Sequence, residues 1–77
     1  MNTRTQTIKV IEIHEGHPDM FEATRADLEE ILATIEGREL HTTETHLIVT
    51  GRGIISGDYY TFMLTGIEAD DPILATR

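Results

Sequence analysis

The sequence predicts an α+β fold of two layers, with one amphipathic helix packed on a small three-stranded sheet in the order β-α-β-β. Three observations predict it: a β-branched run at Thr5–Ile13, a following segment with apolar residues at helical spacing, and two further β-like runs after residue 40. A bend at Gly51–Gly53 would divide the second strand and make the sheet four-stranded.

The first predicted strand is Thr5–Ile13, TQTIKVIEI. Ile8 and Val10 fall on one face of this strand, whereas Ile11 and Ile13 fall on the other. Apolar residues on both faces are typical of a central strand that is covered on both sides. A bulge in the middle of the strand, which shifts the phase, is the alternative.

The helix is predicted to begin near Asp19, because Pro18 cannot continue a helix from upstream and Asp19 with Glu22 has the spacing of a capping box. Gly37 is placed to close the helix in the left-handed conformation. The apolar stripe, at spacings of seven and of three or four residues, consists of Phe21, Leu28, Ile31, Leu32 and Ile35.

The opposite face of the predicted helix is acidic, with Arg25 as its single basic residue. A solvated helix face is the ordinary explanation of such a charge run, and a surface that steers a basic partner is the functional one. The carboxylates of this predicted acidic ridge are Glu22, Asp27, Glu29, Glu30 and Glu36.

Two strands are predicted at Leu40–Thr50 and Tyr59–Ile67, and the glycine-rich stretch TGRGIISGDYY lies between them. Its glycines are spaced G-x-G-x-x-x-G and β-forming residues follow, whereas a dinucleotide-binding loop needs G-x-G-x-x-G and a helix. The stretch is therefore a chain reversal. We expect a tight turn at Gly57–Asp58, with Gly51–Gly53 as the competing position.

One helix covers only one face of a small sheet, so the second face is predicted to be open to another molecule. Tyr and Met are enriched in interface cores, although half-exposed strand residues give the same pattern. The predicted interface on this sheet face consists of Tyr59, Met63, Ile67 and Ile48.

The four histidines are the candidates for a metal site. His14 and His17 lie in the segment HEGH, whose spacing differs from the H-E-x-x-H of a zinc-protease helix. His41 and His46 are five residues apart, which places them on opposite faces of a regular strand. His14 and His17 are therefore weak metal candidates, with turn or surface histidines as the ordinary alternative, and no cofactor is predicted.

The chain has 77 residues, no cysteine, and 14 acidic against 6 basic residues, which gives a net charge of -8. This charge disfavours direct binding to nucleic acid or to anionic lipid. Without an internal repeat or linker, residues 1–77 form one domain, with loose ends at about residues 1–4 and 69–77. Ile73 and Leu74, in the second of these ends, either dock back or serve as a hook for a partner.

Several classes of activity and location are disfavoured. No nucleophile elbow, catalytic cysteine or isolated carboxylate pair is present, so we expect no enzyme. The polar N-terminus lacks the apolar segment of a secretory signal, and no apolar run approaches the length of a membrane span. A cytoplasmic location, in a cell or in a virus-infected host, is therefore expected.

The sequence favours a small acidic protein-binding module, acting as an inhibitor that occupies a basic or nucleic-acid-binding surface of a larger partner. In size, charge and lack of cysteine the chain resembles small phage-encoded inhibitors of host machinery, a resemblance that covers no motif and transfers no residue. The alternative is a homo-oligomeric structural or accessory subunit, such as a homodimer that pairs through its sheet face. A histidine metal-binding protein is the weaker alternative.

Overall fold

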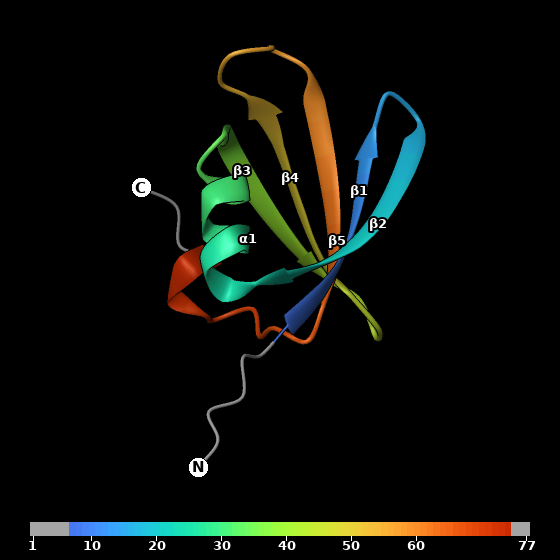
Figure 1. Ribbon diagram of the computed structural model, residues 1–77, viewed down its shortest axis with the longest axis vertical. Coiled ribbons are helices and arrows are strands. Elements are labelled where there is room, and N and C mark those ends of the chain that lie inside the picture. Colours follow the sequence, from blue (N-terminus) through green and yellow to red (C-terminus); the bar gives the residue numbers. More distant parts are fainter. Residues whose placement is uncertain (1–6, 75–77) are drawn as a thin grey trace.

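Within residues 7–74, the part of the chain that the computed structural model describes, five antiparallel strands form one sheet in the order β2-β1-β5-β4-β3 (Figure 1). An α-helix, α1 (Arg25–Leu32), and a short 3-10 helix, η1 (Pro72–Leu74), accompany the sheet. The strands are β1 (Thr7–His14), β2 (His17–Thr24), β3 (Ile35–Thr42), β4 (Leu47–Gly53) and β5 (Tyr59–Thr65).

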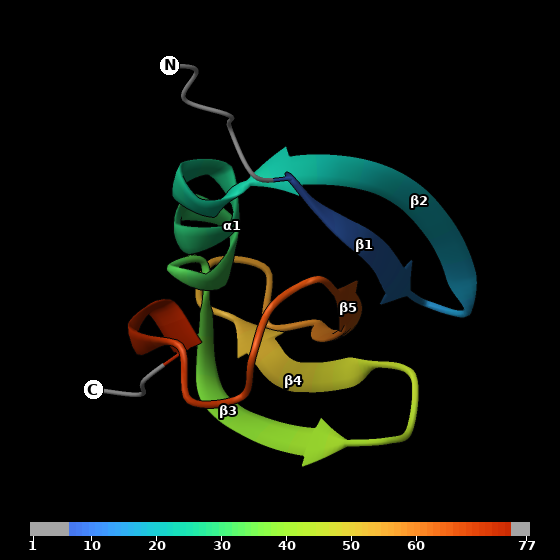
Figure 2. The same cartoon turned by 90° about the horizontal axis from the view of Figure 1, so that it is seen from below.

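The sheet is curled, and α1 connects its two edge strands, β2 and β3. Figure 2 shows α1 at the open side of the curl, between the ends of these strands. β1 pairs with β5, so the first and last strands are neighbours within the sheet. The predicted two-layer α+β fold, with a three- or four-stranded sheet in the order β-α-β-β, is therefore wrong: the structure is mostly sheet, with five antiparallel strands and one short α-helix. The segments that form β2 and most of β3 lack a clear strand pattern in the sequence.

β1 forms nearly at the bounds predicted for the first strand. It lies between β2 and β5 and pairs with both along an unbroken register, which agrees with a central strand rather than a bulge. Ile8 and Val10 are buried on the concave side of the sheet, whereas Ile11 and Ile13 are half-buried on the convex side. The two apolar faces in the sequence therefore correspond to the two faces of one regular strand.

A two-residue turn converts the segment expected to begin the helix into a strand. Glu15 and Gly16 have positive φ angles of 55° and 81°, as a two-residue hairpin turn of this type requires. His14 consequently faces His17 across the turn, and residues 17–24 pair with β1 along their whole length. Residues 17–24 are therefore part of a strand, and the helix begins only after them, at Arg25.

The helix is capped by Thr24 rather than by the predicted Asp19 and Glu22, which both lie in β2. The Thr24 Oγ1 accepts a hydrogen bond from the Asp27 N–H group at 3.1 Å, which satisfies one of the unpaired amides of the first turn. The helix therefore begins directly after a threonine that is followed three residues later by an acidic residue. This is the same kind of spacing as in the predicted capping box, but it lies five residues further along the chain.

Only part of the predicted apolar stripe belongs to α1. Leu28 and Leu32 are buried and Ile31 is partly buried on the helix. Phe21 in β2 and Ile35 in β3 reach the same core from the sheet. The helical spacing in the sequence therefore joins residues of three different elements that converge on one core.

β3 and β4 replace the single strand predicted at Leu40–Thr50. The chain turns between them, where the Thr43 Oγ1 accepts hydrogen bonds from the N–H groups of Thr45 and His46 at 3.3 and 3.0 Å. β3 also starts earlier than predicted. Gly37, expected to end the helix, lies within β3 with a φ of 65°, where the pairing with β4 changes register.

The reversal in the glycine-rich stretch is the loop Ile54–Asp58, which is longer than the predicted tight turn. The Gly53 N–H group donates to the Asp58 carbonyl at 2.8 Å, and Gly57 has a φ of 76°. These contacts agree with a reversal around Gly57. The competing position is wrong, because Gly51 and Gly53 are buried within β4.

The core fills the concave side of the sheet beneath α1. Leu74 is only 1% exposed, so residues 72–74 dock on the core rather than forming a loose end, whereas residues 1–4 and 75–77 lie outside the described residues. Full burial of one such side chain contributes about 1.5–3 kcal/mol. The core residues are Ile8, Val10, Ala23, Leu28, Leu32, Ile35, Leu47, Val49, Phe62, Leu64 and Leu74.

An ion pair between Arg25 and Asp71 links the first turn of α1 to the segment that leads into η1. The hydrogen bond from Arg25 lowers the pKa of the Asp71 carboxyl, and a second hydrogen bond from the Ile73 N–H group acts in the same direction. The bond to Asp71 raises the pKa of Arg25 in turn. The docking of residues 72–74 therefore depends in part on an ionised Asp71.

We predict that Asp71→Asn lowers the free energy of unfolding at neutral pH, because it removes a carboxylate whose charged form the fold favours. A depressed folded pKa gives stabilisation that is complete above the ordinary aspartate pKa of about 3.9 and is lost as the pH falls through the folded value. The difference between wild type and variant should therefore shrink below about pH 4. Urea unfolding of both proteins at several pH values measures this difference in the free energy of unfolding. A constant difference at all pH values would contradict the pairing, and Arg25→Gln should abolish the same pH dependence.

We predict that Gly51→Ala lowers the free energy of unfolding by about 1–3 kcal/mol, the usual cost of overpacking. A Cβ at this position would lie 2.9 Å from the Ile35 Cδ1 and 3.1 Å from the Glu36 carbonyl oxygen. Ile35→Val removes the Cδ1 atom, so the effect of Gly51→Ala should be smaller in that background. Denaturant unfolding of the two single variants and the double variant tests this, and strictly additive losses would argue against the close approach.

Candidate functional site

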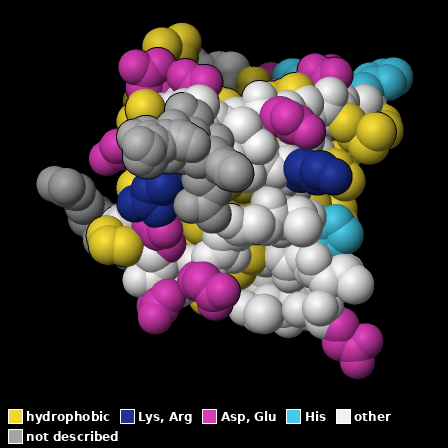
Figure 3. Space-filling model, turned by 60° about the horizontal axis from the view of Figure 1, so that its bottom comes forward, with side chains coloured by type: hydrophobic (Ala, Val, Ile, Leu, Met, Phe, Trp, Pro, Cys, Tyr) yellow, Lys and Arg dark blue, Asp and Glu magenta, His cyan; other side chains and the backbone are white. Residues whose placement is uncertain are grey.

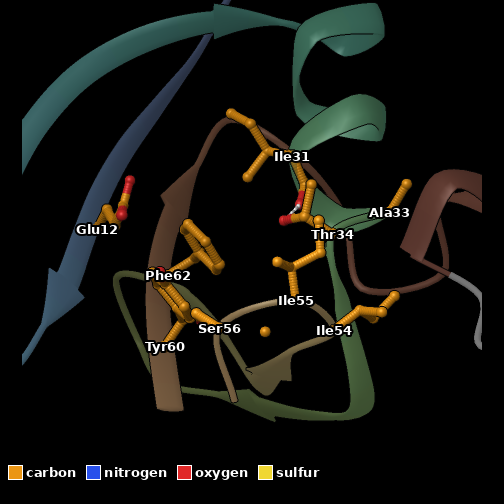
Figure 4. A pocket seen from close by; sticks show the side chains of 10 residues that line it. Glu12, Ile31, Ala33, Thr34, Ile54, Ile55, Ser56, Tyr60 and Phe62 are labelled. Carbon is orange, nitrogen blue, oxygen red and sulfur yellow. Dashed lines mark hydrogen bonds between the residues drawn. The ribbon is translucent and has the colours of Figure 1, made fainter. Parts of the chain in front are cut away.

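A groove of about 620 Å³ lies between the concave face of the sheet, α1 and the β4–β5 loop. Figure 4 shows Tyr60 and Phe62 of β5 along one side of it, with Ile31 of α1 and Ile55 of the loop on the other. Glu12 of β1 stands at the edge beyond Phe62. This concave groove is therefore mainly apolar, with a carboxylate at its border.

The β4–β5 loop brings exposed aliphatic side chains to the concave groove. Ile55 is 99% exposed and Ile54 is 55% exposed, and both line the groove. Exposed isoleucines on a loop next to an apolar groove offer contact area for another molecule, because their transfer out of water is favourable. In the sequence these two residues resemble ordinary strand residues, so their location on a loop was not predicted.

Three parallel rings lead from the core to the rim of the concave groove. Tyr60 and Phe62 are two residues apart on β5 and point to the same side, with ring centroids 6.1 Å apart. His14 lies opposite Tyr60 in the β1–β5 register and stacks on it at 4.4 Å, with an angle of 8° between the rings. The stack fixes the plane of the histidine ring at the rim.

His14, Glu15 and Asp58 form a rim cluster at the end of this stack. The His14 Nε2 lies 3.1 Å from the Asp58 Oδ2, and one potential ligand atom from each of the three residues lies within 4.8 Å of the others. The cluster joins the β1–β2 hairpin to the β4–β5 loop. All three side chains are at least partly exposed, so the cluster is accessible to solvent.

Of the two predicted metal candidates, only His14 belongs to the rim cluster found among residues 7–74. His17 lies directly opposite His14 in the β1–β2 pairing, so both point to the same face of the hairpin. His41 and His46 belong elsewhere: His41 lies on β3 with its Nε2 3.7 Å from the Glu39 Oε1, and the His46 Nδ1 lies 2.8 Å from the Thr45 Oγ1. Asp58 was not predicted, because it joins the histidines only through the pairing of β1 with β5.

The predicted acidic ridge is not the face of one helix. Asp27, Glu29 and Glu30 lie on α1, whereas Glu22 lies on β2 opposite Lys9 and Glu36 lies on β3. The assignment of Glu22 and Glu36 to a helix face is therefore wrong. Acidic side chains occupy several separate parts of the surface shown in Figure 3.

Of the predicted sheet interface, Met63 and Ile48 face each other across β5 and β4. The register extends this contact to Ile11 and then to Met20, so an apolar row crosses four strands on the convex side. We call it the convex row; its members are Met20, Ile11, Met63 and Ile48. Tyr59 is on the same side, 57% exposed, whereas Ile67 lies beyond β5 and packs against the core.

The chain matches no protein-family model, no curated protein and no solved structure. Among residues 7–74, no helix has the length and apolar character needed to cross a membrane. The concave groove, the rim cluster and the convex row are therefore the candidate functional sites of the described residues.

Proposed function

We propose that this protein is a small acidic protein-binding module that receives a basic, partly apolar segment of a larger partner in the concave groove. The observation that carries the proposal is the exposed pair Ile54 and Ile55 beside a groove lined by Tyr60 and Phe62. Apolar and aromatic side chains of this kind dominate the centres of protein interfaces, where they are shielded from water by the partner.

The charge around the concave groove supports a basic occupant. Glu12 borders the groove, and Asp19 lies opposite Glu12 on the same face of the β1–β2 hairpin. A guanidinium or ammonium group in the groove would pair with these carboxylates. The net charge of -8 increases the rate at which a basic partner is encountered.

A module of this kind inhibits its partner when the basic surface that it occupies is one that holds nucleic acid. Its negative field resembles that of a phosphate backbone, so both compete for the same lysines and arginines. The carboxylates of α1, Asp27, Glu29 and Glu30, then contribute to the long-range field rather than to a single contact ridge.

We predict that peptides selected from a random library on the immobilised protein contain Arg or Lys next to an aliphatic or aromatic residue. Their affinity should fall as salt is added, because exposed charges are screened. Ile55→Asp should weaken binding of a selected peptide by about tenfold or more, the loss expected for a central interface residue. Fluorescence anisotropy measures the dissociation constants.

Met20→Asp is the matched control for this experiment. Met20 is also exposed, at 74%, but belongs to the convex row. The substitution Met20→Asp introduces the same charge on the other side of the sheet, and it should change the affinity for the selected peptide by less than about twofold. Selection of acidic peptides, or equal losses in Met20→Asp and Ile55→Asp, would contradict binding in the concave groove.

A second candidate function is a homo-oligomeric structural or accessory subunit that pairs through the convex row. The observation that favours it is the continuity of the row, whose four apolar residues are adjacent in register across four strands. Small domains gain stability when such a face is buried by a second copy. Tyr59, the first residue of β5, extends the convex side of the sheet toward the β4–β5 loop.

If the convex row pairs two copies, wild type should sediment as a dimer and Met63→Asp should sediment as a monomer, because a carboxylate would be buried at the centre of the interface. Ile55→Asp, on the concave side, should leave the dimer intact. Sedimentation velocity at several concentrations distinguishes these results. A wild-type protein that remains monomeric throughout would remove this candidate.

A further inference from the structure

We propose that the rim cluster, with His17 as a fourth ligand, is a binding site for a divalent cation of the zinc type. The proposal is independent of the peptide-binding function, because it concerns the junction of the β1–β2 hairpin and the β4–β5 loop rather than the floor of the concave groove. It rests on the distances between the ligand atoms, on what holds them in place, and on the charge that they bring together.

The distances suit a shared ion. Zinc binds imidazole nitrogen and carboxylate oxygen at about 2.0–2.2 Å, so two ligand atoms on one tetrahedral ion are about 3.4 Å apart. The His14 Nε2 and Asp58 Oδ2 are 3.1 Å apart, and Glu15 supplies an oxygen within 4.8 Å of both. The three potential ligand atoms therefore already lie close to the separation that one shared ion requires.

The ligands are held by the surrounding fold. The stack on Tyr60 fixes the ring plane of His14, at a centroid distance of 4.4 Å. Asp58 is anchored through its backbone, whose N–H group donates to the Ser56 Oγ at 3.2 Å and whose carbonyl accepts from the Gly53 N–H group at 2.8 Å. The His14 ring and the Asp58 backbone therefore lose little conformational freedom when an ion binds.

His17 is the candidate for the fourth ligand. It is exposed and lies directly opposite His14 in the hairpin, where facing side chains have Cβ atoms about 4.5–5.5 Å apart. Its ring does not belong to the group of atoms within 4.8 Å of one another, so it would have to turn toward the ion. Two imidazoles and two carboxylates match the ligands of borderline divalent ions such as Zn²⁺, Ni²⁺ and Cu²⁺, whereas Ca²⁺ and Mg²⁺ prefer oxygen alone.

The charge of the cluster also favours a cation. Glu15 and Asp58 place two carboxyl groups around one imidazole on a protein with a net charge of -8. Like charges at this separation repel, and a divalent ion replaces that repulsion with attraction. An ion at this position would clamp the hairpin to the loop that carries Ile54 and Ile55, and so brace one wall of the concave groove.

Isothermal titration calorimetry of the full chain with ZnCl₂ tests the proposal. We expect one equivalent of zinc to bind, with affinity lowered about tenfold or more by His14→Ala, by Asp58→Asn and by His17→Ala, a loss in the range known for disturbed metal sites. His41→Ala is the matched control, since His41 also lies near a carboxylate but on β3, and it should change the affinity by less than about twofold.

Three results decide the outcome. Absence of binding at millimolar zinc would overturn the site, and so would an equal loss of affinity in His41→Ala, which would indicate scattered surface binding. A zinc affinity that is unchanged by His17→Ala would overturn the assignment of His17 as the fourth ligand. Should His14→Ala fail to fold, as judged by circular dichroism without metal, His14→Gln keeps the side-chain volume closer and must show the same loss.

Discussion

The alternation of β1 is the constraint on which the rest of the molecule depends. Its concave residues run in one line from the core to the rim: Ile8 and Val10 are buried, Glu12 borders the concave groove, and His14 belongs to the rim cluster. The pairing of β1 with β2 and β5 places this line at the junction of the two hairpins. A shift of one residue would move all four side chains to the convex side, because side chains alternate with a period of two.

The strands β1 and β5 were predictable, because their segments are dense in the β-branched and aromatic residues that strands favour. The β1–β2 turn was not, because a glutamate at positive φ is uncommon and Glu15 carries no mark of it in the sequence. Without that turn, the spacing from Phe21 to Leu28 fits one long helix as well as a strand followed by a short helix. Residues 35–39 of β3 were not predicted as a strand, because β3 is an edge strand whose residues are mostly exposed and polar.

In the candidate site, too, the residues that are close in sequence were predictable, whereas those that are joined only by strand pairing were not. The segment HEGH places His14 and His17 within reach of each other, so a weak metal signal was readable from the sequence. Asp58 and Tyr60 complete the site only through the antiparallel register of β1 and β5, which depends on the whole sheet. To predict the concave groove, one would also have had to place Ile55 on a loop. Its apolar, β-branched side chain instead indicates a strand. Binding on the concave side and self-association on the convex side use opposite faces, so the two are structurally compatible.

The most direct test of this account is the register of β1 against β5 in solution, measured by nuclear Overhauser contacts between side chains. The account predicts contacts from the His14 ring to the Tyr60 ring and from Glu12 to Phe62, with Ile11 contacting Met63 on the other face. Contacts from Ile11 or Ile13 to the Phe62 ring would place the alternation in the opposite phase. The core, the concave groove and the rim cluster would then not exist as described.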